Sequence, residues 1–516
     1  AGLNILVDCG MEQGNDVYEN QELPIAASDV DCILLTHAHI DHSGLIPLMY
    51  VNGFRGQVYS TSATAQLCEI MLRDSAHIQM FEAEWRNRKA ARSGGKLKEF
   101  VPLYDMDAAV NVCKQFVGCE YDRVYDIAEG IKIRFTDVGH LLGSASIEVW
   151  ATEKTENGDV TEKIVFSGDI GNINKPIIKD PKHVRDADYV VMESTYGNRS
   201  HGGTPNYVED LTDIFKRTFE RGGNVVIPSF AVGRTQELLY IIRKIKEDNL
   251  VGRDFDVYMD SPLAIEATNI FIKNVESCFD DDAVELVRKG INPLSFPGLK
   301  YATTGDESKQ INFDPNPKVI ISSSGMCEAG RIRHHLKHNL WRPECTIVFV
   351  GYQAVGTTGR IIVDGAEEIK LFGEPIQIKA EIVQLKGSSG HADKDGLLCW
   401  INAFDTKPKK VFVVHGEDSV CDEFTECLKE EYGYDAMAPY TGGSYDLIAD
   451  RVISEGVKER KTRRTTSTQR GKTVFDRLVA AGKRLMTVIT HNEGGTNKDL
   501  AKFTDQINAL CDKWDR

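Results

Sequence analysis

The segment His37-Ala38-His39-Ile40-Asp41-His42 places three imidazoles and one carboxylate within six positions. Neutral imidazole is the commonest metal ligand among side chains, and few structural roles need so many together. In an extended segment His37 and His39 point to the same side, so they can share one ion. Asp41 and His42 follow where the chain turns, and they can face a second ion about 3.5–4 Å away, the spacing of two-metal hydrolytic sites. The alternative is a solvated loop that happens to be rich in histidine.

The neighbouring residues predict how this segment is positioned. Apolar Cys32–Leu35 precede it and indicate a short buried strand. Ser43–Met49 follow it and indicate a turn and then a helix, with Pro47 in the first turn where its missing N–H costs little. The segment therefore lies at the carboxyl end of a strand, where open sheets place their sites.

Three other turns carry an acid or an imidazole directly after an apolar strand. They are Asp137–His140, Ser167–Asp169 and His415–Glu417. Each alone is weak evidence, because acids and histidines at strand ends are more often turn residues. Together with the first segment they predict that ligands from distant parts of the chain converge at the edge of a sheet.

Composition limits the class of protein. The chain has 516 residues, 41% of them hydrophobic, which predicts two to four domains with sizeable cores. The apolar runs are far shorter than the ~20 residues that span a bilayer, and no secretory signal opens the chain. Leu3–Asp8 already looks like a strand within a sheet, so we expect natural residues to precede Ala1. We predict a cytoplasmic protein with no membrane association.

Cysteine usage and charge narrow the class further. The 12 cysteines are scattered without a C-x-x-C pair, which fits reduced, mostly buried thiols and argues against a zinc finger. A net charge of −16 does not favour indiscriminate binding to nucleic acid. A polyanionic substrate would need metal ions or local basic patches.

The pattern of predicted strands and helices changes near residue 200. Before it, short strands alternate with loops, and residues 62–116 look largely helical, with an exposed basic loop at 85–98. After it, helices and strands alternate in the manner of a three-layer α/β domain with parallel strands. Residues 387–446 return to the pattern seen before residue 200. A basic linker at 458–472 then precedes two helices, at about 473–488 and 497–514.

The ordered motifs resemble a known family. H-x-H-x-D-H at 37–42, a distant His140, S-G-D ending at Asp169 and the late His415 resemble the metallo-β-lactamase superfamily. Further motifs resemble those of its β-CASP branch, which contains the pre-mRNA 3′-end-processing endonuclease, the J-type ribonucleases and some DNA-repair nucleases. These motifs are Glu193-Ser194-Thr195-Tyr196-Gly197, Ser389-Gly390-His391-Ala392-Asp393 and Val414-His415-Gly416-Glu417.

The resemblance covers residues 1–446 and implies a fold. We expect an α/β protein whose metallo-β-lactamase αββα sandwich is formed by residues 1–199 and 387–446. A three-layer α/β β-CASP domain would be inserted at 200–386, and residues 447–516 would form a basic linker and a helical C-terminal extension.

The resemblance also implies roles for individual residues. The first of two zinc ions would bind His37, His39 and His140; the second would bind Asp41, His42 and His415; Asp169 would bridge them. Asp8 would orient a ligand from behind. Asp41, His391 and Glu193 would be catalytic, with His391 protonating the leaving oxygen and Glu193 hydrogen-bonded to it. Imidazole and carboxylate ligands without thiolate suit zinc, with manganese as the alternative.

Substrate contacts are predicted on two turns and one basic run. Ser229–Arg234 and Ser323–Met326 follow strands and can present backbone N–H groups to phosphate, and Gly330–His338 is densely basic. We predict RNA contacts at Arg234, Ser324, Gly325, Arg331 and Arg333; simple solvation of this face is the alternative. We expect His334, His335 and His338 to face solvent or substrate, because seven other residues complete the metal shell.

These inferences predict a zinc-dependent ribonuclease that hydrolyses RNA phosphodiester bonds endonucleolytically with two metal ions, in RNA processing or decay. The resemblance implies a 5′-phosphate and a 3′-hydroxyl at the cut, and it is compatible with a homodimer. Histidine at position 415 favours RNA, because DNA-processing members of the branch carry valine there.

Three other functions stay open. The first is a DNA nuclease of the same branch. The second is a small-molecule metallo-hydrolase, which would leave Glu193 and His391 unexplained. The third is an RNA-binding scaffold derived from an inactive nuclease, which the complete ligand set disfavours.

Overall fold

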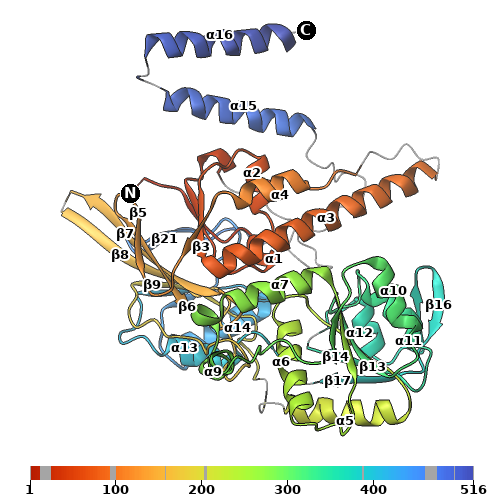
Figure 1. The fold of residues 1–516 in the computed structure, drawn as a ribbon. Coiled ribbons are helices and arrows are strands. Elements are labelled where there is room, and N and C mark those ends of the chain that lie inside the picture. The colour runs from red at the N-terminus through yellow and green to blue at the C-terminus, as the bar shows by residue number, and fades with distance from the viewer. Residues whose placement is uncertain are drawn as a thin grey trace.

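The computed structural model describes residues 2–11, 25–92, 100–156, 158–200, 202, 206–351, 353–385, 389–458, 474–492, 494 and 496–514. Figure 1 shows three parts: a sandwich of two sheets, an inserted domain beside it, and two C-terminal helices, the first of which contacts the sandwich near Ala27–Asp29.

The sandwich contains a four-stranded sheet and a seven-stranded sheet. The first is entirely parallel, in the order β1 (Ile5–Val7), β2 (Cys32–Leu34), β3 (Gln57–Thr61), β4 (Phe116–Cys119). The second has the order β19 (Ala436–Met437), β18 (Lys410–Val414), β9 (Tyr189–Glu193), β8 (Gly158–Phe166), β7 (Ala145–Thr155), β6 (Ile131–Asp137), β5 (Val124–Ala128). Strands β19, β18, β9 and β8 run parallel, and β8 to β5 are joined as antiparallel neighbours.

Successive side chains of a strand point to opposite faces of its sheet, so each sheet can turn one apolar face toward the other. Leu34 of the first sheet packs with Phe135 and Ile147 of the second in one buried cluster between them. The outer face of the first sheet is covered by α1 (Ile40–Ser43), α2 (Ile46–Val51), α3 (Ser62–Arg92) and α4 (Met106–Cys113). That of the second is covered by α13 (Lys394–Ile401) and α14 (Asp418–Glu430). The predicted αββα sandwich is confirmed.

The inserted domain surrounds a six-stranded, wholly parallel sheet. Its order is β12 (Leu299–Tyr301), β11 (Asp256–Asp260), β13 (Lys318–Ser322), β10 (Val225–Pro228), β14 (Thr346–Val350), β17 (Glu381–Leu385). Helices on one face are α5 (Tyr207–Glu220), α6 (Arg234–Glu247) and α7 (Pro262–Lys273); those on the other are α10 (Gly305–Phe313), α11 (Ile332–Asn339) and α12 (Thr358–Val363). The central strands β13, β10 and β14 are buried on both faces, as is usual in parallel sheets, and the predicted three layers are confirmed.

The remaining elements of the described chain lie outside these three sheets and the helices that cover them. They are η1 (Ala27–Asp29), α8 (Val275–Cys278), α9 (Asp281–Arg288), β15 (Glu368–Leu371), β16 (Glu374–Gln377), β20 (Ser444–Asp446), β21 (Arg451–Ser454), α15 (Val474–His491) and α16 (Asn497–Trp514). No helix in the described part of the chain has the length and hydrophobicity needed to cross a bilayer. All twelve cysteines are free, and most are buried.

The predicted basic loop at 85–98 is wrong in its first half. Helix α3 continues through Trp85 to Arg92. Ion pairs one helical turn apart join Glu82 to Arg86 and Glu84 to Arg88, so these charges support a helix. Residues 93–98 of that prediction, and 459–472 of the predicted linker, lie outside the described residues.

Candidate metal centre

Strand ends bring all seven predicted ligands to one edge of the sandwich. His37 and His39 lie between β2 and α1, and Asp41 and His42 lie in α1. The other three follow strands of the second sheet: His140 follows β6, Asp169 follows β8 and His415 follows β18. Residues after β1 hold α1 in place, because Cys9 N–H donates to the His42 carbonyl at 2.7 Å. Gly10, the next residue, has no room for a Cβ, which would lie 1.5 Å from the Asp41 carbonyl oxygen.

The first group of ligand atoms consists of His37 Nε2, His39 Nδ1, His140 Nε2 and Asp169 Oδ2. His39 Nδ1 lies 3.0 Å from His37 Nε2 and 3.2 Å from His140 Nε2. Asp169 Oδ2 lies 3.4 and 3.5 Å from the same two nitrogens. Ligands at 2.0–2.1 Å around a tetrahedral zinc ion are about 3.3–3.4 Å apart. The spacing of this group therefore fits one zinc ion.

The second group consists of Asp41, His42, His415 and the other oxygen of Asp169. Asp169 Oδ1 lies 3.2 Å from His42 Nε2 and 3.4 Å from His415 Nε2. His415 Nε2 is 4.0 Å from Asp41 Oδ2. Its spacing is wider than that of the first group, and it has room for a second cation.

Asp169 lies between the two groups. Its side chain is 1% exposed, and neither oxygen makes a hydrogen bond of acceptable geometry within the described residues. His42 Nε2 is also buried without such a bond. A buried carboxylate without partners is costly, so these atoms fit cations on either side of the carboxylate.

The protonation states suit metal binding. Burial first, and then neighbouring histidines, lower the pKa of His37 and His140, and they lower the pKa of His39 to about 3. These imidazoles are therefore neutral and can bind a cation without losing a proton. Burial opposes the charge of Asp169, but His42 and His415 hold its pKa well below the ordinary value. Burial likewise opposes the charge of His42, yet Asp169 and Asp8 raise its pKa, so a metal ion would take the place of that proton.

Asp8 fixes the position of His42, a member of the second group. Its Oδ2 lies 2.7 Å from His42 Nδ1 and accepts a hydrogen bond from the Thr36 hydroxyl at 2.8 Å. Its Oδ1 accepts from the Thr36 backbone N–H at 2.8 Å. A carboxylate on the far nitrogen fixes the orientation of a metal-binding imidazole. Thr36 was not singled out from the sequence, where nothing distinguishes it from other strand-end residues.

Three turns of the centre have backbone in the left-handed region. Asp8 has φ 58°, Gly168 has φ 58° and His415 has φ 52°. A Cβ at Gly168 would lie 2.9 Å from the Ala145 carbonyl oxygen, so glycine is required there. Positive φ is uncommon in residues other than glycine and persists where the surroundings enforce it, often at functional sites.

His391 and Glu193 form a pair beside the first group. His391 Nδ1 lies 3.3 Å from Glu193 Oε1 and 3.8 Å from Asp169 Oδ2. Glu193 is 1% exposed, and its Oε1 accepts from the Ile170 N–H at 2.5 Å. Burial opposes a charge on His391, but Glu193 and then Asp169 raise its pKa to about 9. The pair can therefore present a proton to a group bound at the ligand cluster.

Comparison with known protein families matches three parts of the chain. Residues 1–172 match a metallo-beta-lactamase superfamily domain, residues 235–362 a Beta-Casp domain, and residues 375–439 a Zn-dependent metallo-hydrolase RNA specificity domain. Ribonuclease TTHA0252 of Thermus thermophilus is 34% identical over 418 residues, which is 81% of this chain and 88% of that protein. The chain belongs to the β-CASP branch of the metallo-β-lactamase superfamily.

Two further relatives have different names. The transcription termination factor FttA of Methanosarcina mazei is 32% identical over 450 residues, which is 84% of this chain but only 66% of FttA. An RNase J-like protein of Methanocaldococcus jannaschii is 31% identical over 418 residues, which is 80% of this chain and 87% of that protein. The predictions of the family and of a metal-dependent hydrolase are confirmed.

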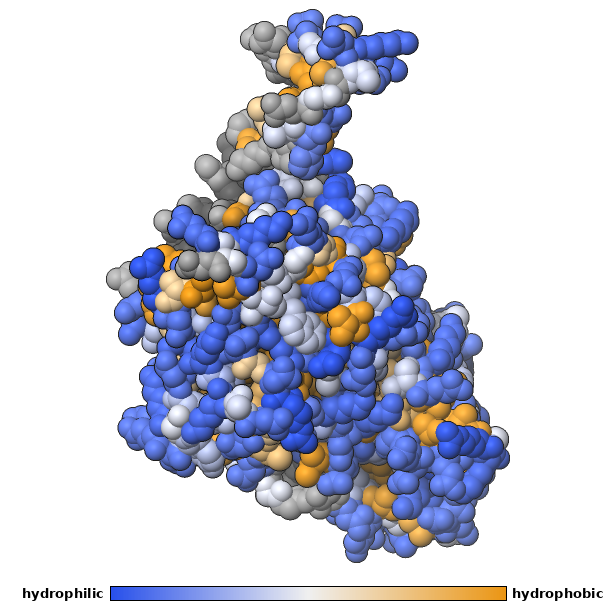
Figure 2. All heavy atoms as spheres, turned by 90° about the vertical axis from the view of Figure 1, so that its left-hand side faces the viewer, coloured by the Kyte–Doolittle hydropathy of each residue, from blue (hydrophilic) through white to orange (hydrophobic). Residues whose placement is uncertain are grey.

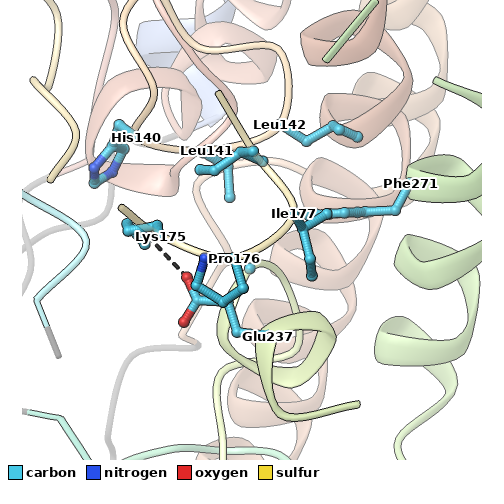
Figure 3. Close-up of a pocket in the computed structure, with 10 residues that line it drawn as sticks. His140, Leu141, Leu142, Lys175, Pro176, Ile177, Glu237 and Phe271 are labelled. Atoms are coloured by element: carbon cyan, nitrogen blue, oxygen red, sulfur yellow. Dashed lines mark ion pairs between the residues drawn. The ribbon is translucent and has the colours of Figure 1, made fainter. Parts of the chain in front are cut away.

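A buried ion pair joins the β-CASP domain to the sandwich next to His140. Lys175 Nζ lies 2.8 Å from Glu237 Oε1, and both side chains are largely buried (Figure 3). Glu237 Oε2 also pairs with Arg234 at the start of α6, at 2.5 Å. Lys175 and Glu237 were not predicted, because their pairing depends on a contact between domains.

The predicted RNA contacts lie in the β-CASP domain and stay predictions. Ser324 and Gly325 lie in the turn after β13, and the Ser324 hydroxyl accepts from Glu328 N–H at 3.2 Å. Arg331 donates to Asp260 at 2.7 Å and to the Ala302 and Thr303 carbonyls, which uses three of its five N–H donors.

The other residues of the basic run differ in exposure. Arg333 lies over the Phe372 ring at 5.0 Å, and His334 and His338 are exposed as expected. The prediction for His335 is wrong, because its side chain is fully buried against Asp260, 2.6 Å away. The helix period of α11 turns His335 inward together with Leu336.

Proposed function

We propose that this chain is a zinc-dependent ribonuclease that hydrolyses phosphodiester bonds within RNA by a two-metal mechanism, in RNA processing or decay. The observation that carries the proposal is the position of Asp169, whose two oxygens face two ligand groups while His391 and Glu193 lie against the same cluster. The relatives named as ribonucleases and the matched RNA specificity domain support RNA as the substrate.

The residues present fit two cations. His37, His39, His140 and Asp169 would hold one ion. Asp41, His42 and His415 would hold the other, together with Asp169, whose Oδ1 lies near His42 and His415. Zinc suits the imidazole and carboxylate set, and manganese is the alternative. When bound, two such ions supply a nucleophile at neutral pH and stabilise negative charge on the phosphoryl oxygens.

The protein's own contribution to the reaction is the proton on His391. The departing sugar oxygen is a poor leaving group unless it is protonated, and a histidine with a raised pKa is mostly protonated at neutral pH. Glu193 keeps His391 charged and holds its ring through Nδ1. Asp8, through His42, keeps a ligand of the second group in place.

The remaining parts of the proposal concern substrate and setting. Arg234, Ser324, Gly325, Arg331 and Arg333 are the candidate contacts to RNA phosphates. The free cysteines support a reducing, cytoplasmic setting. A small-molecule metallo-hydrolase is disfavoured, because it would leave the His391–Glu193 pair unexplained. Metal binding alone does not need a proton donor.

One experiment tests the proposal. The purified protein is incubated with circular RNA and with end-labelled linear RNA of the same sequence, with and without a chelator, and zinc or manganese is then added back. We expect both RNAs to be cut, cleavage to stop with the chelator, and metal to restore it. Asp169→Asn is the inactive control, and DNA of the same sequence tests the substrate.

Each of the other outcomes contradicts a specific part of the proposed function. Linear RNA degraded while circular RNA survives would replace internal cutting by an exonuclease. Equal cleavage of DNA would favour a nuclease without preference for RNA. No cleavage of either RNA by the metal-loaded protein would reject the proposal.

A further inference from the structure

One exposed aromatic ring of the inserted domain lies at the edge of its parallel sheet. Phe230 is in the turn after β10, and its side chain is 46% exposed. Exposure alone does not mark a site, because apolar side chains are scattered in small patches on the largely hydrophilic face that Figure 2 shows. What the exposed ring does therefore has to be inferred from its place in the fold.

Phe230 lies at the switch point of the sheet, where two neighbouring strands continue to opposite faces. Strand β10 is followed by α6 on one face, and its neighbour β13 is followed by α11 on the other (Figure 1). The turns after these two strands leave the sheet in opposite directions. Open α/β sheets bind their ligands at such a point, outside the carboxyl ends of the strands. A ligand bound there would meet the Phe230 ring.

The ring is held in place before any ligand binds. A Cβ on Gly325, in the turn after β13, would lie 3.2 Å from two ring carbons of Phe230, so part of the ring packs against this turn. The Gly325 carbonyl accepts a hydrogen bond from the Gln353 side chain at 3.2 Å. The Phe230 carbonyl accepts from the Thr235 hydroxyl at 2.7 Å. Holding the ring in advance lowers the entropic cost of stacking a ligand on it.

The switch point is close to the candidate metal centre. Phe230 precedes Gly233 by three residues, and a Cβ on Gly233 would lie 3.2 Å from the side chain of Leu141, the residue after His140. Three residues span at most ~11 Å, so the backbone at Phe230 is no further than that from Gly233. An RNA strand with one phosphate at the metal centre can therefore bring a nearby base onto the ring.

The groups beside the ring suit a nucleotide. Gly325, which the ring contacts, directly follows Ser323 and Ser324, and Arg331 lies at the start of α11. Their hydroxyl, amide and guanidinium groups are of the kinds that pair with phosphate and sugar oxygens. Sites for single-stranded nucleic acid combine such backbone contacts with aromatic rings on which bases stack. This polar setting favours a nucleotide over an apolar protein surface as the ligand.

We propose, on the basis of the proposed ribonuclease function, that Phe230 is a stacking platform for one unpaired base of the RNA, a few nucleotides from the phosphate that is cut. Every base has a π-face, so the ring accepts any base. A base within a double helix is stacked on its neighbours and presents only its edges, so it cannot lie on the ring. Phe230 would therefore select single-stranded RNA at one position without selecting a sequence.

RNA binding by the full chain tests the platform. Binding of single-stranded RNA is measured in the Asp169→Asn background, where no cut is expected. Adding Phe230→Ala should weaken binding about 5- to 150-fold, which is the ~1–3 kcal/mol of one stacked base converted at about 1.4 kcal/mol per tenfold. Phe230→Trp should keep the affinity of the parent, and the fluorescence that it adds should be quenched when RNA binds.

Phe313→Ala is the matched control. Phe313 is 72% exposed in the same domain, but it ends α10 just before β13 begins, so it lies at the opposite edge of the sheet. We expect its replacement to leave RNA binding unchanged. Because both rings are largely in contact with solvent, both alanine variants should keep the thermal unfolding of the parent.

A base-free nucleotide locates the stacked base. With Asp169 intact, cleavage is measured for RNAs in which one abasic residue is moved stepwise along the strand. One position near the cut should lower the cleavage efficiency by about 5- to 150-fold, and Phe230→Ala should abolish that position's effect.

Three results would overturn the proposal. They are unchanged RNA binding in Phe230→Ala, which would leave the ring to another partner, an equal loss in Phe313→Ala, and abasic effects that are the same with and without the Phe230 ring. RNA binding that depends on Phe230 in a protein that cuts no RNA would support the platform and reject the ribonuclease alone.

Discussion

The candidate metal centre and the start of α11 are both rich in histidine. Among the described residues, buried polar atoms lack hydrogen-bond partners in the first and have them in the second. At the metal centre, both oxygens of Asp169 and Nε2 of His42 are buried without a hydrogen bond among the described residues. In α11, His335 is equally buried, but its ring nitrogens lie 2.6 Å from Asp260 and 3.0 Å from Asn312. Buried polar groups are nearly always satisfied in native proteins, so the unsatisfied ones mark where a ligand belongs.

The difference separates two roles that look alike in the sequence. Asp260 accepts from Ser308, Arg331 and His335, so it is the centre of a closed network that holds α10 and α11 to β11. Asp169 has several neighbouring nitrogens at 3.2–3.5 Å, which is the spacing of ligands around an ion. Substitution of Asp169 should therefore affect activity without affecting stability, and substitution of His335 should affect stability without affecting activity.

The largest expected effect is that of Asp169→Asn. It removes the charge shared by both ligand groups and keeps the shape of the side chain. We expect RNA cleavage to fall by ~10³-fold or more, at or beyond the upper end of the ~10²–10³-fold that one electrostatic group typically supplies. Bound zinc per chain, measured by elemental analysis, should fall as well. If Asp169→Asn kept its metal and its wild-type cleavage rate, the proposed role of Asp169 between the two ligand groups would be wrong.

His391→Ala should have the next largest effect. Loss of the proton donor should lower the cleavage rate by ~10²–10⁴-fold, the usual contribution of general acid catalysis. Bound metal should stay at the wild-type level, because His391 belongs to neither four-residue ligand group. A loss of metal equal to that in Asp169→Asn would place His391 among the ligands instead.

His335→Ala should act on stability instead. It leaves a buried carboxylate with one partner fewer, and the free energy of unfolding should fall by ~1–3 kcal/mol, the cost of an unmade buried hydrogen bond. Denaturant unfolding measures this loss. Bound metal and the cleavage rate of the folded protein should be unchanged. A large loss of activity with wild-type stability would show that α11 is part of the reaction.

Glu193→Gln should give the smallest effect, a shift in pH dependence. The charge of Glu193 raises the pKa of His391, which has to be protonated to act as an acid. Removing that charge lowers the pKa, so the alkaline limb of the pH–rate profile should move to lower pH. The glutamine oxygen can still accept from Ile170 N–H, so the fold should be kept. An unchanged profile would mean that Glu193 only positions the ring.

The ligand types and their places at strand ends could be read from the sequence. Apolar runs followed by turn residues predict where strands stop, and the carboxyl ends of neighbouring strands meet at one edge, so His37, His140, Asp169 and His415 were expected together. The family resemblance added His391 and Glu193, whose side chains come from motifs almost two hundred residues apart.

Only the tertiary structure decided which polar residues are left without partners. Local pattern cannot tell that His335 turns inward to Asp260 while His334 stays exposed, or that Lys175 and Glu237 meet across two domains. It also did not foresee that α3 runs on to Arg92, where ion pairs support the helix. The sequence by itself determined the kinds of ligands and the order of the elements, because turns and periodicity are local properties. Burial and hydrogen-bond partners depend on contacts between distant segments, so they were decided by the fold.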